Sequence, residues 1–284
     1  MRIRATVAVA TGALALSALA VPAGHAAPAS DRPGVPAYGS ATHQGAAAAP
    51  KGKARAAVDA PVISKVVVNG GKPIVIGTTA VKKVAVSITA SHPSGIRDAD
   101  AIIWLGSSLD SPDAFGFGAT APFTCKAASA TTSTCTQNIE IDPIWLINSD
   151  TRSWNVGAWT QSKDGVGTQN DKFTKTSLQR LSRLDVNAAP EPVKKGGTIT
   201  VTGKLSRANW ETGTYKGYAT QSVQLQFRKK TSSTYSTVKT VKTSNTGTLK
   251  TTTKATVDGY WRWNFAGTST TPAIIPAGDF VDVK

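Results

Sequence analysis

The stretch that most constrains the fold is residues 259–265, Gly-Tyr-Trp-Arg-Trp-Asn-Phe, where large apolar side chains alternate with polar ones. Successive side chains of a β-strand point to opposite faces, so Trp261, Trp263 and Phe265 fall on one face. Each of these side chains can bury about 150–250 Å². We therefore predict that this stretch is the central strand of a β-sandwich, with its three apolar aromatic residues in the core.

The rest of the chain also favours strands over helices. Thr, Ser, Val, Ala, Gly and Lys dominate its 284 residues, whereas Glu, a good helix former, occurs only at positions 140, 191 and 211. β-Branched residues favour strands and are weak helix formers. A chain of this length fits two domains of about 100–130 residues with extensions. The predicted fold class is all-β, with two tandem β-sandwiches.

Residues 1–26 have the pattern of a secretory signal peptide. Arg2 and Arg4 precede a mostly apolar run from Ala5 to Ala20, and small residues follow up to Ala26. The run of about 16–17 residues is shorter than the ~20 that a membrane span needs. We expect cleavage near Ala26, with an earlier Ala-x-Ala match at 18–20 left open. The mature protein should be secreted and extracellular, without a membrane span.

Residues 27–60 are predicted to form a disordered tether rich in Ala, Pro and Gly. Tyr38 is the only Phe, Trp or Tyr in this segment. A segment with so few large apolar side chains buries too little surface to offset the entropy lost on ordering.

The folded part is predicted to divide into a sandwich at 61–183 and a second one at 184–284. The first region contains about seven or eight strand-like runs separated by Gly, Pro, Asp and Ser, and the run from Val81 to Ala90 alternates clearly. The second contains a similar alternation from Ser222 to Arg228. The junction between them is short, so we expect a semi-rigid connection.

Cys125 and Cys135 are the only cysteines of the chain. They enclose a short loop, and in an oxidising compartment they should close it as a disulfide between the arms of a hairpin. A metal site is the competing interpretation, and the absence of a nearby histidine disfavours it.

The second region contains a distinctive set of residues at positions 187–196, Trp210, Tyr215, 217–218, Gln221, 225–230, 259–262 and 265–267. This set resembles bacterial immunoglobulin-like domains found at the C-terminus of secreted Streptomyces-type proteins. From about residue 61 to 284 the chain is similar to exported proteins of that group, some of which carry the label "calcium-binding protein". The resemblance implies two immunoglobulin-like sandwiches and brings no catalytic motif with it.

The residue inventory disfavours an enzyme. After the predicted cleavage only His43, in the tether, and His92, in a turn, remain. A Ser-His-Asp or Cys-His site would depend on His92 alone, and we expect His92 to be an exposed turn residue. The three Glu are too scattered to form a catalytic carboxylate pair. We therefore predict a protein that is not an enzyme and has no cofactor.

Calcium is the alternative cofactor, because hard cations need only oxygen ligands. The candidate metal ligands are Asp98, Asp100, Asp110 and Asp113. No stretch matches the twelve-residue EF-hand loop, and alternate carboxylates at a strand end are commonly solvated.

Positive charge is concentrated in the second region. Residues 185–284 hold 14 basic and 6 acidic residues, net +8, while residues 60–184 hold 12 and 9, net +3. The candidate contacts for an anionic partner are Lys229, Lys230, Lys239, Lys242, Lys250 and Lys254. Such lysines attract anionic wall polymer or polysaccharide, or they keep a sheet soluble and unpaired at its edges. Specific nucleic-acid binding is not expected, because we find no basic motif interleaved with aromatic residues.

Carbohydrate binding would need exposed aromatic rings, and the candidates are Trp210, Tyr215 and Tyr218, in a Gly-containing loop. Loop aromatics of such domains more often cap the core. The leading hypothesis is a secreted, monomeric, non-enzymatic binding or structural module at or near the cell envelope that contacts anionic wall polymer or polysaccharide. The alternative is an extracellular module stabilised by calcium.

Overall fold

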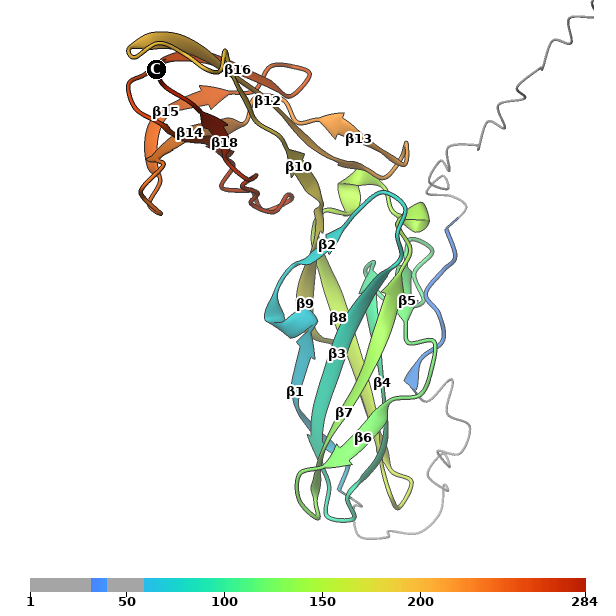
Figure 1. Cartoon of the computed structure of the whole chain (residues 1–284). Coiled ribbons are helices and arrows are strands. Elements are labelled where there is room, and N and C mark those ends of the chain that lie inside the picture. The colour runs from blue at the N-terminus through green and yellow to red at the C-terminus, as the bar shows by residue number, and fades with distance from the viewer. Residues whose placement is uncertain (1–31, 40–58) are drawn as a thin grey trace, which may run out of the picture.

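The computed structural model describes residues 32–39 and 59–284, which form β-strands and short 3-10 turns without an α-helix (Figure 1). The predicted signal peptide and most of the predicted tether lie outside the described residues. Within the two described ranges, no helix is long and apolar enough to cross a membrane. The all-β prediction is confirmed, and the strands form two immunoglobulin-like sandwiches joined end to end (Figure 1).

The first sandwich consists of nine strands. These are β1 Val62–Val68, β2 Ile74–Ile76, β3 Lys82–Ser91, β4 Ile96–Leu105, β5 Phe115–Gly118, β6 Thr124–Ala127, β7 Thr132–Ile141, β8 Ser153–Ser162 and β9 Gly167–Arg180. One sheet has the order β1-β3-β7-β6 and the other β2-β9-β8-β4-β5. The chain contributes β1 to one sheet and β2 to the other, where β2 runs parallel to β9. This division of strands between two sheets is typical of the immunoglobulin fold.

Alternation along the strands builds the core of this sandwich. Val84, Val86 and Ile88 of β3 are at most 1% exposed, as the sequence pattern predicts. Trp154 of β8 packs in the same core, and its indole Nε1 donates to the Asp150 backbone oxygen at 2.9 Å. The buried polar end of this large side chain is therefore satisfied.

The second sandwich also consists of nine strands in two sheets. These are β10 Ser182–Leu184, β11 Asn187–Ala189, β12 Gly197–Asn209, β13 Thr214–Gly217, β14 Ser222–Lys229, β15 Ser236–Lys242, β16 Thr248–Ala255, β17 Gly259–Asn264 and β18 Asp279–Val281. In one sheet β12 pairs with β10, β11, β13 and β16, and the other has the order β15-β14-β17-β18.

Strand β17 lies inside its sheet, between β14 and β18, as predicted for residues 259–265. Trp261, Trp263 and Phe265 are 3%, 0% and 2% exposed, which confirms their place in the core. The indole of Trp263 donates to the Thr202 backbone oxygen of β12 at 2.9 Å. This bond ties the two sheets of the second sandwich together.

The junction between the sandwiches is braced. Only Leu181 separates β9 from β10. The side chain of Trp210, which follows β12, is 1% exposed and belongs to the core of the first sandwich. Its indole donates to the Gly77 backbone oxygen at 2.8 Å, and its backbone N–H donates to the Asn148 side chain at 3.2 Å. These contacts support the expectation of a semi-rigid connection.

The prediction of a disordered tether is wrong for residues 32–39. This segment lies along the first sandwich, where Tyr38 is 5% exposed and packs against Ile102, Trp104 and Trp159 on the outer side of β4 and β8 (Figure 1). Arg32 forms an ion pair with the buried Asp150 at 2.5 Å. The segment has only one large aromatic side chain, but the sheet beneath it supplies a matching apolar surface. The composition of the segment alone could not show that the sheet provides this apolar surface.

The predicted disulfide is confirmed. Cys125 of β6 and Cys135 of β7 stand directly opposite each other in an antiparallel pair and are bonded. Cys135 is 1% exposed and lies in the core of the first sandwich. The bond therefore fixes the edge strand β6 to its neighbour.

Replacing both cysteines by serine should lower the free energy of unfolding of the first sandwich by about 2–3 kcal/mol, because the short closed loop no longer restricts the unfolded chain. Urea unfolding followed by tryptophan fluorescence measures this change. Reductant should shift the wild-type midpoint and leave that of the double variant in place. Equal stability of the two oxidised proteins would contradict the prediction.

Candidate functional site

The six candidate lysines are all exposed, but they do not share one sheet face. Lys239 and Lys242 belong to β15, whereas Lys250 and Lys254 belong to β16. Each of these strands is the edge of its own sheet, and the two edges adjoin. We call these four residues the lysine edge. Lys229 and Lys230 lie apart from it, at the end of β14.

Part of the lysine edge is engaged in the fold. Lys239 stands opposite the buried Leu225, so its side chain starts on the inner side of the sheet. Its ammonium reaches across to β16 and donates to Thr251 Oγ1 at 3.2 Å and to the Thr252 backbone oxygen at 3.0 Å. An inward-pointing lysine on an edge strand prevents pairing with another sheet. Both predicted roles of the lysines, edge protection and attraction of anions, are thus compatible with this geometry.

The prediction of a carbohydrate platform at Trp210, Tyr215 and Tyr218 is wrong for Trp210, which is buried in the core of the first sandwich. The two tyrosines are half-buried and each is covered by a cation. The guanidinium carbon of Arg183 lies 3.5 Å from the ring centre of Tyr215, and that of Arg207 lies 3.8 Å from the ring centre of Tyr218. Trp210 and Tyr215 pack against the core of the first sandwich and so brace the junction, whereas Tyr218 packs against the core of the second sandwich.

The four candidate metal ligands do not come together. Asp100 is 7% exposed and accepts hydrogen bonds from the backbone of Gly39 and Ala101, and Asp98 accepts one from the backbone of Ala99. Asp110 and Asp113 lie in the loop after β4. Among the described residues, no three His, Cys, Asp or Glu side chains form a metal-binding group. The calcium alternative stays a prediction from sequence.

His92 lies in a turn, but the prediction that it is exposed is wrong, because it is 5% exposed. Its Nδ1 contacts Ser94 Oγ at 2.8 Å and lies 3.9 Å from Asp164 Oδ1, while its Nε2 contacts the Asp59 backbone oxygen at 2.6 Å. A catalytic triad needs the hydroxyl and the carboxylate on opposite ring nitrogens. Here both lie at Nδ1, so the three side chains do not have the arrangement of a triad.

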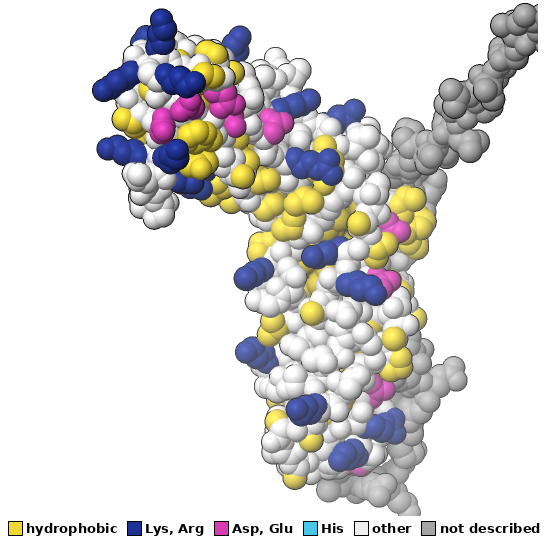
Figure 2. All heavy atoms as spheres, in the orientation of Figure 1, with side chains coloured by type: hydrophobic (Ala, Val, Ile, Leu, Met, Phe, Trp, Pro, Cys, Tyr) yellow, Lys and Arg dark blue, Asp and Glu magenta, His cyan; other side chains and the backbone are white. Residues whose placement is uncertain are grey.

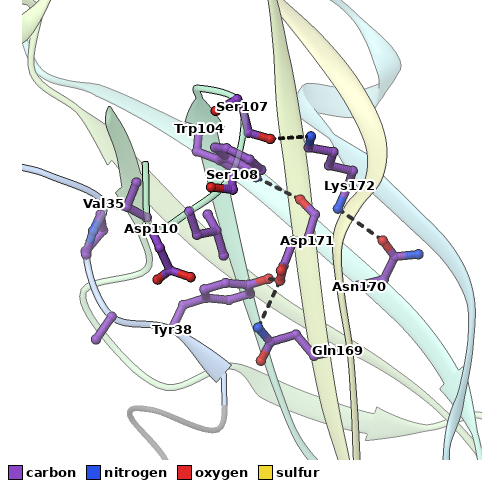
Figure 3. Close-up of a pocket in the computed structure, with 13 residues that line it drawn as sticks. Val35, Tyr38, Trp104, Ser107, Ser108, Asp110, Gln169, Asn170, Asp171 and Lys172 are labelled. Carbon is purple, nitrogen blue, oxygen red and sulfur yellow. Dashed lines mark hydrogen bonds between the residues drawn. The ribbon is translucent and has the colours of Figure 1, made fainter. Parts of the chain in front are cut away.

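An open hollow of about 650 Å³ lies between segment 32–39 and the outer side of β4 and β9 (Figure 3). Its polar lining comes from the loop after β4 and from the middle of β9. The side chains that bear on its chemistry are Tyr38, Trp104, Asp110, Gln169, Asp171 and Lys172.

Asp171 is the centre of the hydrogen bonds in this hollow (Figure 3). Its carboxylate accepts from the Tyr38 hydroxyl and from Gln169 Nε2, the latter at 2.9 Å. Its backbone oxygen accepts from Trp104 Nε1 at 2.7 Å. Burial, followed by the hydrogen bond to Asp171 and its negative charge, raises the pKa of Tyr38 well above its usual range. The hydrogen bonds fix segment 32–39 to the sheet.

The charged groups that line the hollow are the carboxylates of Asp110 and Asp171 and the ammonium of Lys172. Asp171 and Lys172 are already hydrogen-bonded within the protein. Lys172 Nζ donates to the Ser107 backbone oxygen at 2.7 Å and lies 5.5 Å from the ring centre of Trp104. The ring of Trp104 is fully buried, so no flat aromatic surface is presented to a sugar. This arrangement serves the attachment of segment 32–39 better than the binding of a ligand.

Comparison with protein families found a similarity over part of the chain, to a family without an assigned role. Residues 77–160 match a model described as "Family of unknown function (DUF5707)". This match runs from the loop after β2 into β8, all within the first sandwich. Comparison with curated proteins found no match.

Several solved structures are similar at low identity. The D00-D0 domain of intimin is 14% identical, with a TM-score of 0.27, and the match covers 76% of this chain and 99% of that one. The ectodomain of the teleost fish polymeric Ig receptor is 12% identical, with a TM-score of 0.23 and coverage of 75% and 96%. Domains A168-A170 of titin are 9% identical, with a TM-score of 0.25 and coverage of 78% and 65%. Similarity this low does not extend a function to this chain.

Replacing Trp210 by alanine should lower the free energy of unfolding by about 3–5 kcal/mol, because it leaves a cavity in the first sandwich. Thr214→Ala, at an exposed position of β13, is the matched control and should change it by less than about 0.5 kcal/mol. Denaturant unfolding measures both. A change below about 1 kcal/mol in Trp210→Ala would contradict the buried role.

Tyr38→Phe should make the stability of the protein less dependent on pH at the alkaline end. Because the pKa of Tyr38 is raised in the folded state, its contribution is fully present below about pH 10 and decreases as the pH rises beyond that value. Urea unfolding at pH 8 and pH 11 should show a larger loss in the wild type than in the variant. Equal losses would contradict the prediction, since the other tyrosines and lysines are common to both proteins.

Proposed function

We propose that this protein is an exported, non-enzymatic binding or structural module that acts at or near the cell envelope, where its second sandwich contacts anionic wall polymer or polysaccharide. The observation that carries the proposal is the positive charge of that sandwich, net +8 over residues 185–284 against +3 over residues 60–184. All six candidate lysines are exposed there. Figure 2 shows Lys and Arg side chains on several sides of this sandwich, with some acidic side chains among them.

The proposed partner is a polymer because single exposed charges bind weakly. An exposed ion pair contributes about 0.2–1 kcal/mol, and physiological salt screens charges beyond about 8 Å. Several lysines that contact one long anion add their contributions and also steer its approach. Lys229, Lys242 and Lys250 form no ion pair among the described residues, so they are available for such contacts.

Export is supported by the predicted signal peptide together with the disulfide. The bond between Cys125 and Cys135 persists in an oxidising compartment such as the cell exterior. The braced junction supports a structural role as well, because its contacts restrain the charged second sandwich relative to the first (Figure 1).

The purified mature protein should sediment with isolated cell wall at low salt and be released by high salt. Replacing Lys229, Lys242 and Lys250 by glutamine should weaken the association about tenfold, if each lysine contributes roughly 0.5 kcal/mol. The control carries the same charge change on exposed residues of the first sandwich, Lys65, Lys126 and Lys175 replaced by glutamine. Absence of sedimentation at low salt, or equal weakening in both variants, would contradict the proposal.

A further inference from the structure

The outer face of the sheet β15-β14-β17-β18 carries cations and aromatic rings in alternation. It follows from the pattern of β17, because burial of Trp261 and Trp263 turns Tyr260 and Arg262 outward. We call this surface the arginine–aromatic face. Its members are Arg228, Lys230, Tyr235, Tyr260, Arg262 and Phe280.

The register of the strands places these residues side by side. Arg228 of β14 stands opposite Tyr260 of β17, which stands opposite Phe280 of β18. The guanidinium carbon of Arg228 lies 3.9 Å from the ring centre of Tyr260, and the ring centres of Tyr260 and Phe280 are 5.1 Å apart. Lys230 Nζ lies 5.3 Å from the ring centre of Phe280. The row therefore runs across three strands.

Tyr235 links this row to a second guanidinium. The guanidinium carbon of Arg262 lies 3.6 Å from the ring centre of Tyr235, and that of Arg228 lies 5.4 Å from the same point. Since both distances are measured from one ring, the two arginines lie close enough to contact one short stretch of a polymer. Stacking on a ring also holds each guanidinium in a fixed orientation, which reduces the entropy lost when it binds.

Both guanidinium groups lack an acidic partner. No carboxylate of the described residues lies within 4.0 Å of Arg228 or Arg262. Arg262 Nε donates to Gln226 Oε1 at 2.9 Å, and one amino group of Arg228 donates to the Ser232 backbone oxygen at 2.8 Å. Each guanidinium has five N–H donors, so most of its donors take no part in these hydrogen bonds. These donors are available to a carboxylate, whose geometry the planar guanidinium matches.

The acids of this part of the sheet, Asp258 and Asp279, are already engaged or lie on its inner side. Asp258 contacts Lys230 at 3.8 Å and accepts from the backbone of Val283 at 2.9 Å. Asp279 stands opposite Trp261, on the inner side of the sheet, and accepts from the backbone of Ala188 at 2.7 Å. The face thus keeps its positive potential next to its two arginines.

Side-chain amides continue the face beyond Arg262. Gln226 stands opposite Arg262 and is buried at 8% exposure, whereas Gln224 and Asn264, which stand opposite each other in the next row, reach the surface. Gln224 Oε1 lies 3.4 Å from Asn264 Nδ2 and 3.5 Å from Gln226 Nε2. Amides can donate to hydroxyl groups and accept from them. Arginines next to amides match a partner that carries carboxylates and hydroxyls together.

We propose that the arginine–aromatic face is the binding site for an acidic polysaccharide, with sugar carboxylates on Arg228 and Arg262 and sugar hydroxyls on the amides of Gln224 and Asn264. The assignment rests on the proposed function, because it specifies the polymer and the face that recognises it. Planar guanidinium groups bind carboxylates through two parallel hydrogen bonds. Because the stacked guanidiniums cover the tyrosine rings, recognition depends on charge and hydrogen bonds more than on sugar stacking.

The test uses the full mature chain and polygalacturonate, a polymer of carboxylated sugars, at physiological salt. Replacing Arg228 and Arg262 by glutamine should weaken binding by at least about tenfold. The control, Lys65→Gln with Lys175→Gln, removes the same charge from exposed positions of the first sandwich and should weaken binding by less than about threefold. Methyl-esterified polygalacturonate, which has the same sugars without the charge, should bind at least about tenfold more weakly to the wild type.

A second variant keeps the charge and covers the case in which the glutamine variant does not fold. Arg228→Lys with Arg262→Lys retains two cations but loses the planar guanidinium, so it should still weaken binding by at least about fivefold. Near-ultraviolet circular dichroism verifies that each variant is folded. Wild-type affinity in the lysine variant, or equal weakening in the arginine and control variants, would overturn the assignment.

Two further outcomes separate this assignment from the proposed function. One outcome is competition by single-stranded DNA at a phosphate concentration equal to the carboxylate concentration of polygalacturonate. Such competition would overturn the assignment, because the face would then bind any polyanion. Full polygalacturonate affinity in the glutamine variant would overturn it even if the wild type sediments with cell wall. Failure of the wild type to sediment with wall at low salt would instead overturn the proposed function.

Discussion

The constraint on which the second sandwich depends is the side-chain alternation of β17. Trp261, Trp263 and Phe265 must share one side of the strand, and their burial fixes which side faces the core. The same alternation points Tyr260 and Arg262 outward, where Tyr260 lies between Arg228 of β14 and Phe280 of β18. The core and the arginine–aromatic face are therefore two results of one register. A one-residue slip would lose both.

The sequence was sufficient for the architecture because the signals for it are local. The alternation in β3 and β17, the pair of cysteines and the short junction each span about ten residues or fewer. The structure confirms the strands, the core aromatics and the disulfide. The role of Trp210 was not local. Its side chain packs in the core of the first sandwich, and its indole donates to the Gly77 backbone oxygen. No pattern near position 210 therefore distinguishes a buried tryptophan from an exposed one.

The candidate binding surfaces show the same limit. The lysines could be identified as exposed, but their division between the edges of two sheets depends on strand order. The arginine–aromatic face is scattered over residues 228–280, and only pairing brings Arg228, Tyr260 and Phe280 into one row. A search for a basic motif interleaved with aromatic residues along the chain could not find it, because the interleaving runs across the strands. Only one part of this face was indicated by the local sequence, namely the outward orientation of Tyr260 and Arg262.

The outer faces of one sheet in each sandwich differ in character, and this difference bears on function. In the first, the outer side of β4 and β8 presents Ile102, Trp104 and Trp159, and the chain covers it with its own Tyr38. In the second, the outer side of β14 and β17 presents arginines, amides and half-buried rings, and none of the described residues covers it with a comparable segment. An apolar face needs a cover to avoid exposing it to water, whereas a face of stacked cations is stable when solvated. The second sandwich can therefore leave this face open, and an open, fixed pair of guanidinium groups without counter-ions is suited to an anionic partner.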